Sequence, residues 1–476
     1  MRMVARSLPL VCLLPLAGAA ACFSKDEGKP SAPPIPQQDA APPPAAGGTG
    51  AFGIVTVNGK QKMYLPQQPQ FDADSGAVSS AIAVVDVAAA GNAPSGVPAL
   101  ITNIELPVPD GGLGGVAYAT ATGGDSSTVV AVSTDFPIVW FIDPTADRVT
   151  GTLTLDATYG RSSFSGGGGY VTGVAVDSAH HRAILSVWNG FAIVDLGTQK
   201  IASVIEAPPA ENFGFDSVHQ RILAPFYGCT TSTATGADGS LLTPSSCDRP
   251  KGPDGVTVMT DGLSVIDLTD DTVYTYENPT PPDGGIDGFP LDPNDPVGSE
   301  PDSASADPTT GVVVVPSEGN GFQSIIDFSK ATFDKASKTV TAPQTILGTG
   351  EISDLDAVAI EPSSHLAVWE DEFGGSVAVG DLVQLNAGGT AWAYAPLPPL
   401  PDGSAFHNVG DPHGLAVTTA LTSGGPVAFV VDSGLRWVAR VDVHAMAQHA
   451  VGDASVPLAD GGLDGLVTYL DARTKE

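Results

Sequence analysis

Positive charge is scarce in this chain. The 476 residues contain 20 lysines and arginines against 53 aspartates and glutamates, which gives a formal net charge of −33. A surface this acidic repels nucleic acid phosphates and anionic lipid headgroups, so nucleic acid binding is excluded as a function. Carboxylates in Gly- and Pro-rich loops can hold Ca²⁺, but more often they only keep a β protein in solution.

Cysteine is also scarce, with four residues in the chain. Cys12 lies in an expected leader and Cys22 at its end, which leaves Cys229 and Cys247. In an oxidising compartment these two cysteines can pair only with each other. That disulfide would stabilise the fold by roughly 3 kcal/mol according to the chain-entropy model. Neither has a Cys-x-x-Cys partner, so a metal site on them is the less favoured interpretation.

The apolar run at the start of the chain is too short to span a bilayer as a helix. Arg2 and Arg6 precede an apolar core over residues 8–16, and small residues follow over 17–21. This order predicts a signal peptide over residues 1–21, and therefore an exported protein.

Cys22 directly follows Ala19-Ala20-Ala21. This junction resembles the cleavage site of bacterial lipoproteins, and the resemblance implies that Cys22 is lipidated. That family usually has leucine where this chain has Ala19. Ordinary secretory cleavage near Ala19 or Ala21, with Cys22 incidental, is the alternative.

Residues 22–50 are rich in proline and glycine and poor in residues that could build a core. Such a composition favours extended, solvated conformations. We expect a disordered tether that holds residues 51–476 off the membrane. The predicted location is the bacterial cell envelope, on its periplasmic or cell-surface side, with the lipid anchor as the only membrane contact.

The longest readable pattern lies between residues 174 and 196. Apolar runs at 174–176, 183–187 and 191–194 predict three short antiparallel strands. The second turn is predicted at Asn189-Gly190, because both central residues of a type I′ turn need a positive φ.

The third strand of this pattern ends in two apolar residues and an aspartate, and the ending recurs along the chain. The recurring aspartates are Asp86, Asp143, Asp195, Asp267, Asp327, Asp381 and Asp442. They are 57, 52, 72, 60, 54 and 61 residues apart, near the period of a four-stranded propeller blade with loop insertions. Since a strand-end aspartate accepts hydrogen bonds from the next turn, we predict turn formers and not catalytic acids.

Four histidines fall in equivalent turns, which form the first hairpin of several repeats. The hairpin turns are at 177–182, 216–221, 307–311 and 361–365, and the histidines are His180, His181, His219 and His365. Because successive blades hold such turns far apart, turn geometry is favoured over a metal cluster.

The whole pattern, an inner strand ending in Asp-Pro or Asp-Ser, a hairpin and then apolar-apolar-Asp, resembles the YVTN-type β-propeller repeat. It is also similar to lactonase-like and six-bladed gluconolactonase-type propellers. The resemblance covers roughly residues 52–473 and implies an all-β propeller of seven four-stranded blades, with six as the alternative. It does not imply one function, because propellers host many unrelated activities.

Two further features lie outside the regular repeat, a long insertion and the closure of the ring. An insertion over residues 228–262 in blade four contains Cys229 and Cys247, and a long stapled loop is more often functional or partner-facing than accidental. The sequence leaves two arrangements open for the ring, and in the first the C-terminal segment 466–470 completes blade one. In the alternative, residues 53–57 fill that place and 466–470 pack outside.

Lactonase-like propellers place function near the axis, where each outer strand leads to the next inner strand. The residues of this chain that match those positions are Tyr170, Asn212, Asp302, Asp356 and His413, the last within Asp411-Pro412-His413-Gly414. By this resemblance Asp302 and Asp356 are candidate ligands of Ca²⁺ or another divalent cation, and Asp356 and His413 are candidate catalytic residues. Alternatively, these groups line a water-filled channel.

The sequence therefore favours a monomeric binding or scaffold module over an enzyme. This module is expected to contact a protein or glycan partner at the cell envelope, and Ca²⁺ or another divalent cation is its one candidate cofactor. The alternative is a metal-dependent, lactonase-like hydrolase with its site on the propeller axis.

Overall fold

The structure is a computed structural model of the chain. The residues that it describes are 52–71, 78–89, 96–107, 117–156, 159, 171–187, 190–208, 210, 212–226, 262–278, 301, 303–317, 322–348, 355–371, 375–389, 392–407, 414–419, 425–448, 463 and 465–475. The predicted signal peptide, the tether with Cys22 and the predicted Cys229–Cys247 pair lie outside these residues and stay predictions. No helix among the described residues is long and apolar enough to cross a membrane.

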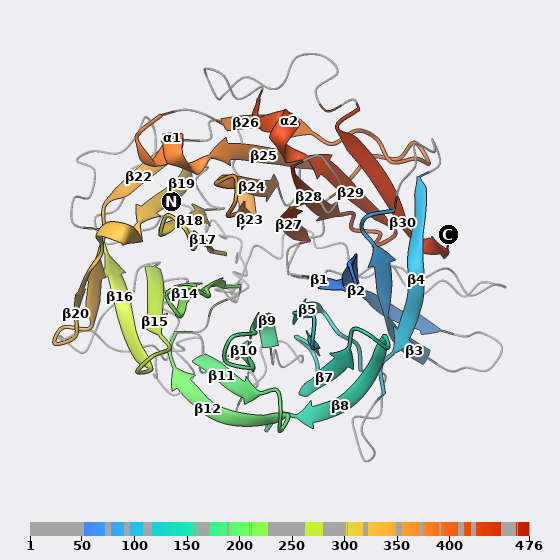
Figure 1. The fold of residues 1–476 in the computed structure, drawn as a ribbon, viewed down its shortest axis with the longest axis horizontal. Coiled ribbons are helices and arrows are strands. Elements are labelled where there is room, and N and C mark those ends of the chain that lie inside the picture. Colours follow the sequence, from blue (N-terminus) through green and yellow to red (C-terminus); the bar gives the residue numbers. More distant parts are fainter. Residues whose placement is uncertain are drawn as a thin grey trace, which may run out of the picture.

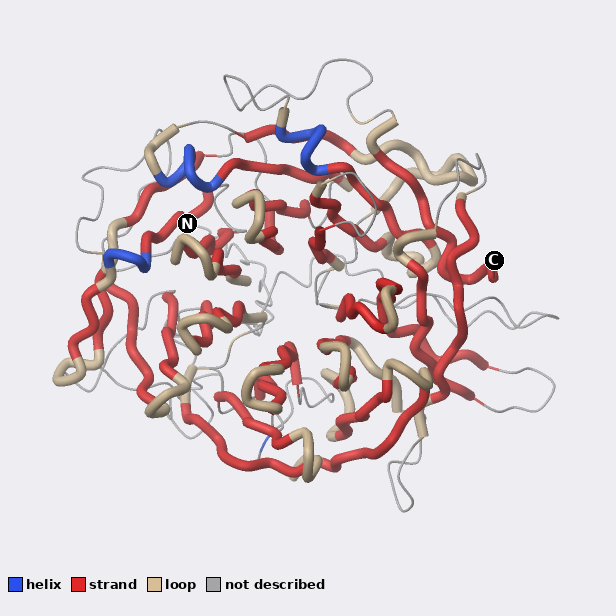
Figure 2. Tube along the Cα trace, viewed as in Figure 1, coloured by secondary structure: helices blue, strands red, loops and turns tan. Residues whose placement is uncertain are grey.

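The described strands form antiparallel four-strand units in chain order around a common centre (Figure 1). The first strand of each unit is innermost and the fourth is outermost, and Figure 2 shows that helix is confined to short peripheral segments. This arrangement is a β-propeller, so the predicted all-β propeller fold is confirmed. Each unit is called a blade below.

The blades are described by their strands, and the first three are regular. Blade one is β1 (Gly53–Val57), β2 (Lys60–Phe71), β3 (Val78–Asp86) and β4 (Val97–Glu105); blade two is β5 (Ala121–Gly124), β6 (Val129–Val132), β7 (Ile138–Asp143) and β8 (Arg148–Thr154); blade three is β9 (Val171–Asp177), β10 (Arg182–Val187), β11 (Gly190–Asp195) and β12 (Lys200–Glu206).

The next two blades share an inserted ribbon. Blade four is β13 (Gly214–Asp216), β14 (Arg221–Phe226), β15 (Gly262–Asp267) and β16 (Thr272–Glu277); blade five is β17 (Ser305–Asp307), β18 (Val312–Ser317), β19 (Phe322–Asp327) and β22 (Gln344–Gly348). Between β19 and β22 come the short helix η3 (Phe328–Lys330) and the ribbon of β20 (Thr332–Asp334) and β21 (Thr339–Thr341). β21 pairs in parallel with β16, so the ribbon from blade five covers the outer edge of blade four.

The last two blades each contain a short helix after the third strand. Blade six is β23 (Leu355–Glu361), β24 (Leu366–Asp371), β25 (Ser376–Asp381), α1 (Leu382–Asn386) and β26 (Trp392–Pro396); blade seven is β27 (Leu415–Thr419), β28 (Pro426–Val431), β29 (Trp437–Asp442), α2 (Val443–Ala447) and β30 (Val467–Lys475).

The core lies between neighbouring blades. Second strands such as β18 and β24 are buried along their whole length because a blade packs on both of their faces, whereas the outer strand β8 alternates exposed and half-buried residues. One apolar cluster joins Tyr64 of blade one to Trp140 of blade two. Continuous apolar runs in the sequence therefore mark the middle strands.

All seven strand-end aspartates are turn formers, as predicted. Each accepts a hydrogen bond from a backbone amide two or three residues later, at 2.6–3.1 Å. Asp327, Asp381 and Asp442 thereby cap the N-termini of η3, α1 and α2.

The predicted turn at Asn189-Gly190 is wrong by one residue. Gly190 belongs to β11 and pairs with Val187, so the two strands are linked by residues 188 and 189, which lie outside the described residues. Gly190 has φ 133°, and a Cβ at this position would overlap the carbonyl oxygen of Ile205 on β12. Glycine is required there by the close approach of a neighbouring strand and not by a turn.

Of the two arrangements that the sequence left open, the one in which residues 466–470 complete blade one is wrong, and residues 53–57 fill that place. β1 fills the innermost position of that blade through a tight turn at Asn58-Gly59, where both residues have a positive φ. This local hairpin needs far less loop closure than pairing with the distant C-terminus. β30 is instead the fourth strand of blade seven, and it also pairs in parallel with β4, which closes the ring through its outer strands.

Candidate functional site

The antiparallel topology gives the ring two different faces. We call the face that carries the first-to-second and third-to-fourth strand links of each blade the turn face. The handover face carries the second-to-third links and the connections to the next blade. The predicted axial site belongs to the handover face, and the predicted histidine turns belong to the turn face.

Most of the predicted axial residues cannot be compared with the structure. Tyr170, Asp302 and His413 lie outside the described residues, and Asp356 is described only by its backbone within β23. Asn212 is half-buried, and its Oδ1 accepts a hydrogen bond from the amide of Phe213 at 2.9 Å. This bond is local to the start of blade four, so the described atoms do not join Asn212 to the other candidates.

Asp356 nevertheless occupies a distinctive place in its strand. Leu355 pairs with Asp371 and Ala357 pairs with Glu370, which makes Asp356 the extra residue of a β-bulge. Bulges redirect side chains and are common beside active sites.

Two acidic residues of β24 with buried side chains pair with the residues on either side of this bulge. Glu370 is 0% exposed and Asp371 is 6% exposed. Oε1 of Glu370 accepts a hydrogen bond from the amide of Gly414 at 3.0 Å, which ties the residue after His413 to blade six. The handover ends of blades six and seven therefore bring together the Asp356 backbone, Glu370, Asp371 and Gly414.

Glu370 and Asp371 were not among the residues predicted from the sequence. A signal was present, because two acidic residues end the apolar run 366–371, and buried charges require partners. Glu370 comes four residues after Leu366, the residue that pairs with Glu361 in the first hairpin of blade six, and Ser186 holds the same position after Arg182 in blade three. The hydroxyl of Ser186 donates to the carbonyl of Ala210 at 2.8 Å. Both residues tie a second strand to the connection leading to the next blade, so Glu370 has at least a structural role.

The described residues contain no group of three or more histidine, cysteine, aspartate or glutamate side chains that could hold a metal ion. The predicted ligands Asp302 and Asp356 have no described side chains and are not covered by this finding.

On the turn face, each first-hairpin acid is buried and accepts a hydrogen bond from the residue three positions later. The pairs are Asp177 with His180, Asp216 with His219, Asp307 with Thr310 and Glu361 with Ser364, at 2.7–2.8 Å. The residues one position further, His181, Gln220, Gly311 and His365, all have a positive φ of 54–74°. Turn geometry therefore explains where the four histidines lie, as predicted.

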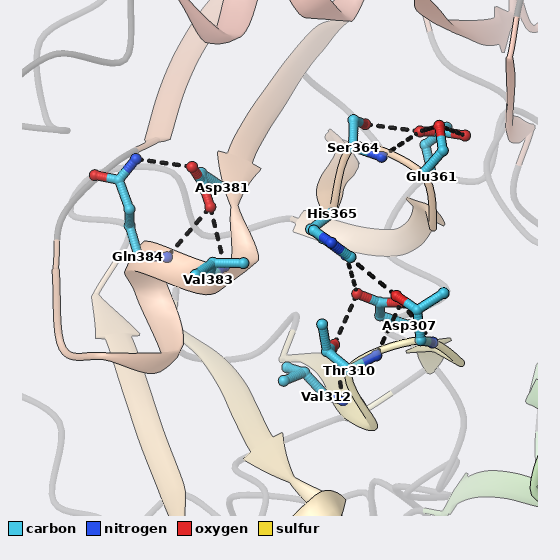
Figure 3. Close-up of polar contacts among 11 residues, drawn as sticks. Asp307, Thr310, Val312, Glu361, Ser364, His365, Asp381, Val383 and Gln384 are labelled. Carbon is cyan, nitrogen blue, oxygen red and sulfur yellow. Dashed lines mark hydrogen bonds and ion pairs between the residues drawn. The ribbon is translucent and has the colours of Figure 1, made fainter.

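His365 reaches across to the neighbouring blade. Figure 3 shows its ring pointing at Asp307 of blade five, with Nδ1 2.7 Å from Oδ2 of a carboxylate that is 0% exposed. At another junction an Arg182 nitrogen donates to Oε1 of Gln220 at 2.7 Å, which joins blades three and four. Lys335 of the ribbon pairs with Asp270 of blade four. Side chains of the turn face thus link neighbouring blades.

Hydrogen bonds hold the pKa of Asp307 below its usual value. Burial alone would raise the pKa of this carboxyl, but donors from Thr309, Thr310 and His365 outweigh burial. A carboxyl with a lowered folded-state pKa stabilises the fold above the unfolded pKa, and this stability is lost as pH falls through the folded pKa.

Replacing Asp307 by asparagine is expected to lower the free energy of unfolding at pH 7, and the deficit should shrink as pH falls below about 3.9, the pKa of an unfolded aspartate. At low pH the wild-type carboxyl is protonated and loses the same interactions. Urea unfolding of both proteins between pH 7 and pH 2 measures the difference. A deficit that does not change with pH would contradict the argument.

No family model matches the chain, and no curated protein matches it. Among solved structures, it is similar to the hydrazine synthase of Kuenenia stuttgartiensis, with 15% identity and a TM-score of 0.45 over 72% of this chain and 81% of the other. It is also similar to the WD40 domain of Toxoplasma gondii coronin, with 10% identity and a TM-score of 0.43 over 83% of each chain. A protein of unknown function from Desulfotomaculum acetoxidans has 14% identity and a TM-score of 0.43 over 82% and 96%. Similarities this low carry no information about function.

Proposed function

We propose that the chain is an exported, membrane-tethered β-propeller that acts as a binding or scaffold module at the bacterial cell envelope. One observation carries this proposal. The first-hairpin carboxylates of blades three to six and the imidazoles of His180, His219 and His365 are engaged in turns and links between blades. Groups engaged in this way hold strands and neighbouring blades in fixed positions, as the frame of a binding module requires.

The proposed partner is a protein or glycan. It is proposed to bind mainly to the insertion of blade four, which contains the predicted Cys229–Cys247 disulfide. A net charge of −33 favours a partner with a basic surface and a binding rate that falls with salt. The chain is proposed to act as a monomer, without nucleic acid, and to touch the membrane through its lipid anchor only.

Deleting residues 229–247 from the full chain tests the proposed contact. Cross-linking in intact cells, followed by identification of the partner and titration with the purified partner, is expected to show loss of binding with an unchanged melting temperature. A matched variant, Cys229→Ser with Cys247→Ser, keeps the loop and removes only the proposed staple, so it should weaken binding less. Full binding by the deletion variant would overturn the proposed contact.

Replacing Cys22 by serine tests the tether. The lipidation reaction requires the thiol, so the variant is expected to lose acyl labelling and to move from the membrane fraction to the soluble fraction. Cys229→Ser serves as the control and should remain in the membrane fraction. Membrane retention and labelling of Cys22→Ser would contradict the lipoprotein proposal.

The second candidate function is a metal-dependent, lactonase-like hydrolase on the handover face. The observation that favours it is the bulge at Asp356 opposite the buried Glu370 and Asp371. Oxygen donors of this kind suit Ca²⁺, and such an ion polarises an ester or lactone carbonyl. A lactone screen with the wild type and Asp356→Ala is the test, and hydrolysis that the variant loses while staying folded would establish it.

A further inference from the structure

A cavity of about 410 Å³ lies on the turn face between blades three and four, which we call the junction cavity. Its walls include His180, Arg182, Asp195 and Ser203 from blade three and Asp270 and Asp271 from blade four. The two blades are neighbours around the ring (Figure 1), and the bond from Arg182 to Gln220 fixes them to each other at this place.

The junction between blades two and three provides an internal comparison. Gly151 lies opposite Phe141, two residues before the strand-end Asp143, and Ser203 lies opposite Ile193, two residues before Asp195. Each position follows a bulge in the outer strand, so Gly151 and Ser203 are equivalent.

The residues facing these two positions are equivalent as well. Gln199 and Asp271 each come four residues after the strand-end aspartate of the next blade, with φ of 54° and 56°. In the junction between blades two and three the Gln199 amide lies directly against Gly151, where an added Cβ would overlap Oε1 and come within 2.9 Å of Cδ. Asp271 is shorter by one methylene, so the space that the glutamine amide fills in one junction is open in the next.

The cavity has an excess of negative charge. Nε of Arg182 donates to Asp177 at 2.9 Å, which neutralises the guanidinium, and Lys335 neutralises Asp270. Asp195 and Asp271, on opposite blades, have no ion-pair partner among the described residues. A hydrogen-bond donor that carries a positive charge matches these walls better than the neutral amide of the preceding junction.

We propose that the junction cavity binds the guanidinium or ammonium group of an arginine or lysine side chain presented by a partner protein. This inference rests on the proposed binding function and assigns part of the recognition to one site. Such a side chain would take the place that Gln199 occupies in the preceding junction, with its charge between Asp195 and Asp271.

The first experiment titrates the full chain with Nα-acetyl-arginine methylamide and with the citrulline analogue, which has nearly the same shape and no charge. Saturable binding of the arginine probe, at least tenfold tighter than the citrulline probe, is expected. Equal binding of the two probes, or binding of neither, would overturn the inference.

Two reciprocal variants locate the site. Ser203→Gly with Asp271→Gln copies the filled junction into the open one and is expected to reduce affinity for the arginine probe at least tenfold. Gly151→Ser with Gln199→Asp makes the opposite change and should raise the stoichiometry from one probe to two. Asp195→Asn, which removes the negative charge and keeps the size of the side chain, should also weaken binding of the probe. Full binding of the probe by the first variant and by Asp195→Asn, with an unchanged stoichiometry in the second variant, would overturn the assignment of the site.

The same variants separate this inference from the proposed function. If Ser203→Gly with Asp271→Gln loses the probe but still binds the cross-linked partner at full affinity, the partner side chain does not use the cavity and the inference fails, while the proposed function stands. Reduced partner affinity in the same variant, with a retained melting temperature, supports both.

Discussion

Alanine at position 190 is expected to lower the free energy of unfolding by about 2–5 kcal/mol, the sum of a left-handed backbone penalty of about 1–2 kcal/mol and an overpacking cost of about 1–3 kcal/mol. Gly190 has φ 133°, a value that alanine rarely adopts. Its Cβ would overlap the carbonyl oxygen of Ile205 and lie 2.7 Å from the amide nitrogen of Ala207. Backbone atoms of a paired strand cannot move aside without breaking the sheet of blade three.

Gly403→Ala is the matched control for this prediction. Gly403 also has a positive φ, 86°, but no heavy atom lies within 4 Å of the position its Cβ would take. The control should therefore cost only the backbone penalty, about 1 kcal/mol. Urea unfolding measures both variants. Equal losses would show that the close approach of Ile205 contributes nothing.

The second large effect is expected for Asp147→Asn, which should lower the free energy of unfolding by about 3 kcal/mol because it leaves one partner of a largely buried ion pair unpaired. Asp147 accepts from Nζ of Lys62 and from the hydroxyl of Tyr64, both at 2.7 Å, across the junction of blades one and two. The side chains of Lys62 and Asp147 are 10% and 14% exposed. Asparagine keeps the size and tolerates the φ of 46° at this position.

The double variant Lys62→Met with Asp147→Asn tests the cause. Because it removes both charges, it should recover most of the stability that Asp147→Asn loses. Tyr64→Phe, which removes one neutral donor, should cost about 1 kcal/mol. A double variant no more stable than Asp147→Asn would show that the charge of Lys62 is not the source of the loss.

The sequence predicted those parts of the fold that depend on local chemistry. Asp195 and its counterparts act through amides two or three residues away, so a single repeated motif was enough to identify the turns. Continuous apolar runs also identified the middle strands of blade three. Burial on both faces of a blade removes any alternation from their sequence.

The predictions failed where a distant segment decides the local structure. Gly190 was placed in a turn because Asn-Gly is a turn signal, whereas the residue that requires glycine is Ile205 on the next strand. Ring closure depended on whether β30 joins β29 and β4 or takes the place of β1, and the local pattern of residues 466–470 suits either arrangement.

The candidate site was only partly accessible from sequence. The resemblance to lactonase-like propellers pointed to the connections between blades, but Glu370 and Asp371 lie in a strand and became visible only through their pairing with the bulge at Asp356. The junction cavity is a difference between two equivalent pairs, Gly151 with Gln199 and Ser203 with Asp271. Detecting it requires the register of outer strands, which a sequence pattern does not define.

Metal analysis of the purified full chain, paired with melting curves in EDTA and in Ca²⁺, tests most directly whether the propeller binds partners or performs metal-dependent hydrolysis. The account predicts no stoichiometric divalent ion and the same melting temperature in both solutions. One tightly held ion per chain, whose removal lowers the melting temperature and which Asp356→Ala abolishes, would contradict the binding-module account and favour the hydrolase.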